Sequence, residues 1–203
     1  LKALCEWLGS SLAGRGVLIV PGGWRFADAV READAAYRLS PEASHRMAIL
    51  AMDQFGLMLA DLTPNSKAVS SLAEAAGAGK AGLLPILLPS KLLEAEDPFE
   101  PSWDVTSDSI AALIASKAGA DAAYLLKDVD GIFTADPKLD ANARLLPKLK
   151  ASDLAGMRSC VDRALPRLIQ RLGIRCVVLN GRFPDRLLAA IEGRPATYTV
   201  IEP

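Results

Sequence analysis

The sequence from residue 125 to residue 137 reads Leu-Leu-Lys-Asp-Val-Asp-Gly-Ile-Phe-Thr-Ala-Asp-Pro. It contains the end of an apolar run, 122–126, that predicts a buried strand. Charged residues follow at once, namely Lys127, Asp128, Asp130 and Asp136. Lys127 can neutralise phosphate charge, and the carboxylates can hold Mg²⁺ through water or fix a ribose. A solvated acidic loop is the alternative interpretation, whereas a calcium loop is excluded because its acidic spacing and terminal Glu are absent.

Strands and helices alternate on both sides of this segment. Apolar runs predict strands at 17–20, at the start of 67–80, and at 83–88, 122–126, 176–179 and 197–201. Helical spacing predicts helices at 1–12, 26–37, 41–62, in the second part of 67–80, at 91–96, from about 108 to 119, at 160–172 with a kink near Pro166, and at 184–192. The alternation predicts an α/β fold, a three-layer αβα sandwich with a mostly parallel open sheet. In such a sheet ligands bind beyond the carboxyl ends of the strands.

The composition agrees with one globular domain over residues 1–203. Half of the residues are hydrophobic (51%), so a large core can form, and the net charge is −1 without a basic block. We therefore expect no nucleic-acid partner. Three scattered cysteines and no long apolar run predict a cytoplasmic protein without structural disulfides or a membrane span.

Two further turns can carry chemistry. Pro21-Gly22-Gly23 ends a predicted strand before a helix, and its glycines allow backbone N–H groups to approach an anion. The segment 102–109 is crowded with Ser, Thr and Asp, more than helix capping requires, and it contains Asp108 at a helix start. A tight turn and a simple capping run are the alternative interpretations.

Two other features are not expected to be functional. Gly77-Ala78-Gly79-Lys80 resembles the end of a P-loop, but the preceding glycine and the metal-binding hydroxyl are missing, so it is interpreted as a helix C-terminal turn. His45 is the only histidine, and a solvated or capping role is favoured over catalysis.

Taken together, these segments resemble the amino-acid kinase superfamily of aspartate, glutamate and uridylate kinases. Residues 125–137 followed by Lys148 resemble its nucleotide-binding segment, and residues 107–111 resemble its Asp-containing helix start. Residues 20–23 are similar to its second glycine turn, and 156–157 and 177–181 to its C-terminal part. The segments 21–23, 26–30 and 102–109 are most similar to an aspartokinase-like branch linked to methanofuran and tetrahydromethanopterin one-carbon metabolism.

The resemblance implies an ATP- and Mg²⁺-dependent kinase, often a homodimer, that phosphorylates a phosphate-bearing acceptor such as an aminomethylfuran-methyl phosphate. Two departures stand out. The family's opening strand with Lys-x-Gly-Gly is not seen, so we expect it to be missing from the N-terminus. Cys160 stands where the family often has a lysine, and Arg158 or Arg163 is a candidate to replace that charge.

The resulting hypothesis divides the chain into an acceptor side, mainly 1–120, and a nucleotide side, mainly 121–203. Asp108 is the predicted catalytic residue, orienting donors or the metal. The predicted ATP-binding residues are Lys127, Asp128, Asp130, Gly131, Phe133, Asp136 and Pro137. The predicted acceptor-binding residues are Gly22, Gly23, Trp24, Asp28, Trp103, Asp104, Thr106 and Ser107.

Several alternatives remain open at this point. Trp24 and Trp103 can stack on a flat amine-bearing acceptor, with Asp28 or Asp104 meeting its amine, or they can be ordinary packing residues. The acceptor can be an amino acid or another carboxylate. The chain can also be a non-catalytic nucleotide-binding or storage protein on the same fold. A nicotinamide dehydrogenase is less favoured, because no Gly-x-Gly-x-x-Gly follows the strands.

Overall fold

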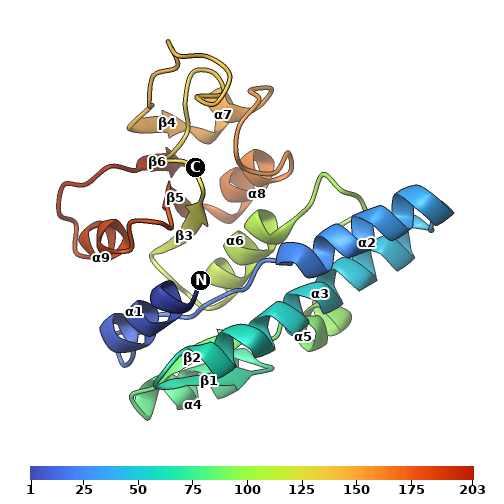
Figure 1. Cartoon of the computed structure of the whole chain (residues 1–203), viewed down its shortest axis with the longest axis vertical. Helices are drawn as coiled ribbons and strands as arrows, with labels where there is room; N and C mark the ends of the chain where they lie inside the picture. The colour runs from blue at the N-terminus through green and yellow to red at the C-terminus, as the bar shows by residue number, and fades with distance from the viewer. The chain divides into compact units, whose positions relative to one another are not determined.

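The computed structural model describes all residues, Leu1–Pro203, and divides them into two units, Leu1–Trp103 and Asp104–Pro203 (Figure 1). The first unit contains α1 (Lys2–Leu12), α2 (Trp24–Tyr37), α3 (Pro41–Leu62), β1 (Ser66–Val69), α4 (Leu72–Lys80), β2 (Leu84–Leu87) and α5 (Ser90–Glu96). The second contains α6 (Ser107–Lys117), β3 (Ala122–Lys127), β4 (Lys148–Lys150), α7 (Ala151–Leu154), α8 (Leu165–Leu172), β5 (Arg175–Asn180), α9 (Asp185–Ile191) and β6 (Thr199–Glu202). Each helix is too short or too polar to span a lipid bilayer.

The first unit is built on a parallel pair of strands, β1 and β2, connected by α4. Local capping explains where its helices begin: the Ser40 hydroxyl accepts a hydrogen bond from the Ala43 N–H ahead of α3, and Ser71 does the same for Glu74 ahead of α4. The long helix α3 contacts both strands, and α2 packs along α3 (Figure 1). The segment that resembles a P-loop lies in the last turns of α4, which confirms its interpretation as a helix end.

The second unit carries a four-stranded sheet in the order β3-β5-β6-β4. The pairs β3–β5 and β4–β6 are parallel, and β5–β6 is antiparallel. Helix α6 packs against β3 and α8, whereas α9 contacts β5 from the other side of the sheet (Figure 1). The strand β5 is almost wholly buried, as an uninterrupted apolar run predicts for a central strand.

The structure corrects three expectations of local structure. The predicted strand at 17–20 is reduced to a bridge in which Ile19 pairs with Ile86, because Pro21 has no N–H with which to continue the ladder. The predicted helix at 160–172 begins only at Leu165, since Pro166 lies in its first turn and starts it rather than kinking it. The polar connection after β3 ends in β4 and α7, which the sequence patterns did not indicate.

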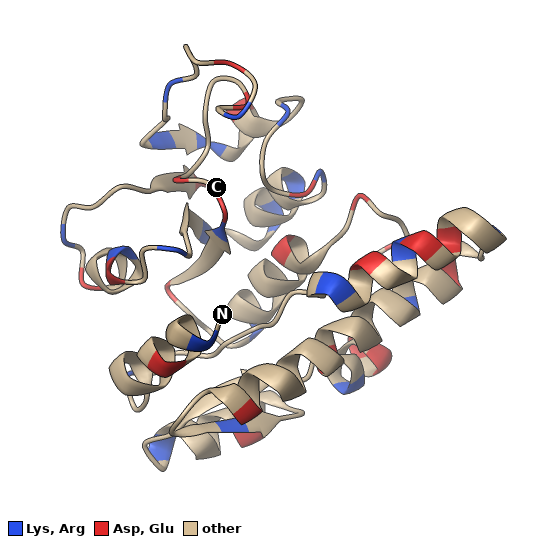
Figure 2. Ribbon diagram, viewed as in Figure 1, with Lys and Arg blue, Asp and Glu red and all other residues tan.

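Charged side chains are interspersed by sign along both units (Figure 2). His45 lies on α3, where its Nε2 is 2.7 Å from the Asp97 carboxylate. The His45 side chain is only 10% exposed, so this contact within the first unit differs from the solvated or capping role that was predicted.

Candidate active site

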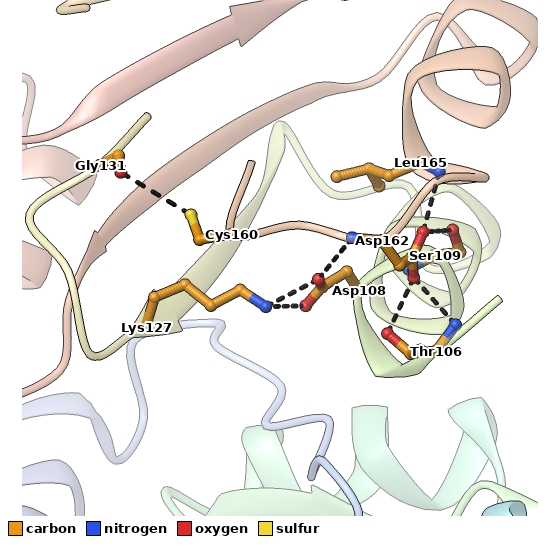
Figure 3. A network of polar contacts seen from close by, with 8 residues as sticks. All are labelled: Thr106, Asp108, Ser109, Lys127, Gly131, Cys160, Asp162 and Leu165. Atoms are coloured by element: carbon orange, nitrogen blue, oxygen red, sulfur yellow. Dashed lines mark hydrogen bonds and ion pairs between the residues drawn. The ribbon is translucent and has the colours of Figure 1, made fainter. Parts of the chain in front are cut away.

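The start of α6 meets the end of β3 at a buried ion pair. Asp108, the second residue of α6, is 6% exposed, and Lys127 is the last residue of β3. The Lys127 ammonium donates to both carboxylate oxygens of Asp108 at 2.7 Å (Figure 3). Two segments that are 19 positions apart in the sequence, each predicted to carry function, are thus brought together in one unit.

Burial dominates the electrostatics of this pair. Removing the Asp108 carboxylate from water raises its pKa above the ordinary value of 3.8, and the positive charge of Lys127 offsets only part of that rise. Burial therefore disfavours the charged form of Asp108, and the contacts from Lys127 and from the Asp162 N–H favour it.

A third residue, Asp162, completes the network, and the sequence patterns did not single it out. Its backbone N–H donates to an Asp108 oxygen at 3.1 Å, while its own carboxylate accepts hydrogen bonds from the start of α6 and from Leu165 at the start of α8 (Figure 3). The available signal was an acidic residue just before a proline-initiated helix, which is a common capping arrangement.

The loop after β3 is held by cations and amides. Asp128 accepts from Lys138 at 2.6 Å, and this hydrogen bond lowers the pKa of Asp128. Asp130 accepts from the Asn180 amide at 2.9 Å and from Arg186 at 2.7 Å, and these contacts lower the pKa of Asp130. Both carboxylates are ionised and partnered.

Lys138, Asn180 and Arg186 were not predicted as site residues. Asn180 is the last residue of β5, directly beside Lys127 in the parallel register of β3 and β5. The adjacency of two strand ends was the signal that could have found it, because parallel neighbours end at the same edge of a sheet. Arg186 lies in the helix that follows.

The rest of the predicted nucleotide segment forms an ordered turn. Gly131 has φ +155 and lies so close to Thr199 that a Cβ atom would stand 2.4 Å from its hydroxyl oxygen. Phe133 forms an isolated antiparallel bridge with Leu145. Asp136 accepts from the backbone N–H of Lys138 at 2.9 Å, which closes a tight turn around Pro137.

Five of the predicted acceptor residues belong to the first unit: Gly22, Gly23, Trp24, Asp28 and Trp103. Trp24 begins α2 and stacks on Phe55 with ring centres 5.2 Å apart. Trp103 donates its indole N–H to Asp34, ten residues further along α2, which places the two anchor points about 15 Å apart at the rise of an α-helix. The two tryptophans therefore do not form one aromatic clamp within this unit.

The carboxylates predicted to meet an amine have arginine partners. Asp28 pairs with Arg31 at 3.0 Å, and Asp104, in the second unit, pairs with Arg163 at 3.5 Å. Arg31 also lies 4.8 Å from the centre of the Trp103 ring. An acceptor amine would have to displace these guanidinium groups.

The remaining two predicted acceptor residues, Thr106 and Ser107, open α6 in the second unit. The N–H and hydroxyl of Thr106 both donate to Asp162, at 2.9 and 3.0 Å. Thr106 is thus engaged in holding the helix start. Acceptor binding by these residues stays a prediction.

Comparison with known proteins identifies the family. The sequence model of the amino acid kinase family matches residues 1–180. This chain belongs to the amino acid kinase family. The prediction of that family, of its fold class and of a phosphotransferase is therefore confirmed.

Relatives of this kinase cover most or about half of its length. The [5-(aminomethyl)furan-3-yl]methyl phosphate kinase of Methanocaldococcus jannaschii is 34% identical over 201 residues, 99% of this chain and 89% of that protein. The uridylate kinase of Natronomonas pharaonis is 34% identical over 106 residues, 47% of each chain. Among solved structures, the Archaeoglobus fulgidus uridylate kinase aligns with TM-score 0.69 at 24% identity, covering 91% of this chain and 84% of that one.

Membership of a kinase family implies ATP as the phosphoryl donor. Cys160, at the position where a family lysine was expected, is half-buried, with its sulfur 3.7 Å from the Gly131 carbonyl oxygen. Burial raises the pKa of the Cys160 thiol, and the charges of Lys127 and Asp108 act on it from nearby. Cys160, where a family lysine was expected, is thus near enough to Lys127 for that charge to lower its pKa in part. Its own hydrogen bond goes to Gly131 (Figure 3).

Proposed function

We propose that this kinase transfers the γ-phosphoryl group of ATP to the phosphate of a small acceptor such as [5-(aminomethyl)furan-3-yl]methyl phosphate. The near-full-length likeness to the Methanocaldococcus jannaschii enzyme of that name supports the acceptor class. The observation that carries the proposal is the ion pair of Asp108 and Lys127 at the carboxyl end of β3.

The chemistry asks for alignment and positive charge rather than for a covalent intermediate. An anionic oxygen of the acceptor phosphate forms a bond to the γ-phosphorus while the bond from that phosphorus to the β,γ-bridging oxygen breaks. The electron pair of that bond leaves with ADP, and the acceptor becomes a diphosphate. No general base is needed, because the attacking oxygen carries no proton that must be removed.

Lys127 supplies the positive charge in this scheme. Its charge acts on Cys160, where a family lysine was expected, and we propose that Lys127 neutralises the transferring phosphoryl group in place of that lysine. Asp108 holds that ammonium in one orientation through both carboxylate oxygens. Gly131, Phe133, Asp136 and Pro137 shape the adjoining loop, which we propose to contact ATP.

We propose that Mg²⁺ arrives with ATP. The side chains offer no group of three or more His, Cys, Asp or Glu arranged to hold a metal ion, and Asp128 and Asp130 are paired with Lys138 and Arg186. Mg²⁺ keeps several waters and is commonly bound through substrate phosphates with few protein carboxylates, which fits this donor set. When bound, the ion would offset charge on the phosphates.

We also propose that the kinase is a homodimer. Met47, Leu50 and Leu57 lie on one side of α3 and are 37–55% exposed, which supports an apolar contact surface there. Light scattering at several protein concentrations tests this, and a mass of one chain throughout would contradict it.

A panel of acceptors tests the proposed function. The chain is incubated with ATP, Mg²⁺ and, separately, the aminomethylfuran-methyl phosphate, UMP, aspartate and glutamate, and products are identified by ³¹P NMR. We expect a diphosphate signal with the furan phosphate. Turnover only with a carboxylate would assign the alternative kinase activity, and ATP binding without turnover on any acceptor would assign the non-catalytic alternative.

A further inference from the structure

We infer that Asp162 is a positioning residue that sets the orientation of Asp108 and, through it, of Lys127. The inference rests on the proposed function, because it gives the role of Asp162 in phosphoryl transfer. Asp162 was not among the predicted site residues. It joins the starts of α6 and α8 to the buried ion pair.

The Asp162 carboxylate is a shared cap. One oxygen accepts from the N–H and hydroxyl of Thr106 and from the N–H of Ser109, at 2.9, 3.0 and 3.0 Å. The other accepts from the Ser109 hydroxyl at 2.6 Å and from the Leu165 N–H at 2.9 Å. The network is drawn in Figure 3.

This arrangement replaces the usual local cap. Thr106 is the N-cap residue of α6, yet its side chain makes no capping hydrogen bond within its own helix. Asp162 reaches the same N–H groups from 53 and 56 positions away, and its negative charge faces the positive ends of both α6 and α8. Thr106 and Ser109, which flank Asp108 in the sequence, are therefore both held by the Asp162 side chain.

The backbone of Asp162 contacts the ion pair of Asp108 and Lys127 directly. Its N–H donates to the Asp108 oxygen Oδ2 at 3.1 Å, and that same oxygen accepts from Lys127 at 2.7 Å. With its carboxylate tied to α6, Asp162 cannot turn its N–H away from Asp108 without breaking the cap. Loss of the cap would release the donor and the helix start that carries Asp108.

A purely structural cap would act on stability alone, and a matched control separates the two roles. Asp153 caps α7, where its carboxylate accepts from the Lys150 N–H at 3.2 Å. Asp153→Asn therefore removes one carboxylate cap in the same unit. The variants to compare are Asp162→Asn, Asp153→Asn, Asp108→Asn and the double variant Asp162→Asn/Asp108→Asn.

Kinetics give the first readout. We expect Asp162→Asn to lower kcat roughly 10- to 100-fold, because small misplacements of reacting groups are that costly. The KM for ATP should stay within about threefold, as for an interaction made in the transition state. In the Asp108→Asn background the same change should lower kcat less than about twofold, since the two residues act as one unit. Asp153→Asn should lower the melting temperature and leave kcat unchanged.

The second readout does not depend on turnover. Lysines are reductively ¹³C-methylated, and the Lys127 resonance is assigned with Lys127→Arg. We expect that resonance to move in Asp162→Asn in the same direction as in Asp108→Asn, and to stay in place in Asp153→Asn. A kcat for folded Asp162→Asn equal to that of Asp153→Asn, or an unmoved Lys127 resonance, overturns the inference. If the wild-type chain turns over no acceptor, the proposed function fails, and the resonance still decides the role of Asp162.

Discussion

The Lys127 ammonium lies 2.7 Å from each of the two carboxylate oxygens of Asp108, and Asp108 is almost completely buried. This contact joins the last residue of β3 to the first turn of α6. The two polar segments of the second unit that were predicted to act together contact each other through this charged pair.

The acidity of Asp108 should depend on Lys127. Its pKa is raised by burial and lowered by the charge of Lys127, with burial the larger effect. Replacing Lys127 by Met should therefore raise the pKa of Asp108 further. A ¹³C NMR titration of the carboxyl carbon measures both values. A midpoint below 3.8 in the wild type, or a lower one in Lys127→Met, would contradict the assignment of these effects.

The same burial makes the stability of the fold pH-dependent. A carboxyl whose pKa is raised in the native state contributes stability below its unfolded value of 3.8, and this contribution is lost as the pH rises through the raised native pKa. Asp108→Asn lacks this titration. We expect the melting temperature of the variant, relative to that of the wild type, to rise as the pH rises above 3.8. A relative melting temperature that falls over the same pH range would show the opposite sign.

Gly131 should tolerate no side chain. An added Cβ would meet the Thr199 hydroxyl at 2.4 Å and a Leu145 methyl at 2.8 Å, and Thr199 also bonds the Ile132 N–H and the Leu146 carbonyl. Overpacking of this kind costs about 1–3 kcal/mol. We expect Gly131→Ala to lower the free energy of unfolding by at least that amount in a urea titration.

Gly77→Ala is the matched control for that substitution. Gly77 lies within α4, and an added Cβ there meets nothing within 4 Å. Alanine in a helix interior is favoured over glycine by about 0.5–1 kcal/mol, so this variant should be more stable than the wild type. Equal losses in both variants would argue against the crowding at Gly131.

ATP should protect Cys160 from alkylation. Its sulfur lies 3.7 Å from the carbonyl oxygen of Gly131, in the loop proposed to contact ATP. Cys5 and Cys176 are buried, and burial raises the pKa of the Cys176 thiol to about 12, so both should react only after unfolding. Mass spectrometry after a timed iodoacetamide pulse measures each site. An alkylation rate at Cys160 that saturating ATP leaves unchanged would argue against nucleotide binding at this loop.

The sequence predicted that Asp108 lies at a helix start and Lys127 at a strand end, because both kinds of boundary have strong local signals. It did not predict Asp162, since the helix over 165–172 was expected to begin at 160 and the residue was placed inside it. Pro166 explains the error, because proline is as typical of a first turn as of a kink. A cap that reaches across more than fifty positions leaves no periodic pattern in the sequence.

The fold, too, was predicted only in part. Apolar runs located most of the strands, and alternation with helices predicted their parallel pairing, but β6 pairs antiparallel with β5 although its run looks like the others. A long connection that contains a helix, as between β5 and β6, is typical of parallel neighbours, so the sequence pattern indicated the wrong direction here. Asn180 was missed as a site residue because its role depends on β5 lying beside β3.

Turnover by Asp108→Asn tests the central role of the ion pair most directly. The measurement is kcat for ADP formation with ATP and the furan phosphate, compared with the wild type and with Glu94→Gln, which removes a carboxylate from the exposed Arg46 pair. We expect Asp108→Asn to remain folded by circular dichroism and to lose about 10²- to 10³-fold in kcat, whereas Glu94→Gln keeps wild-type turnover. A folded Asp108→Asn variant with near-wild-type kcat would contradict the account.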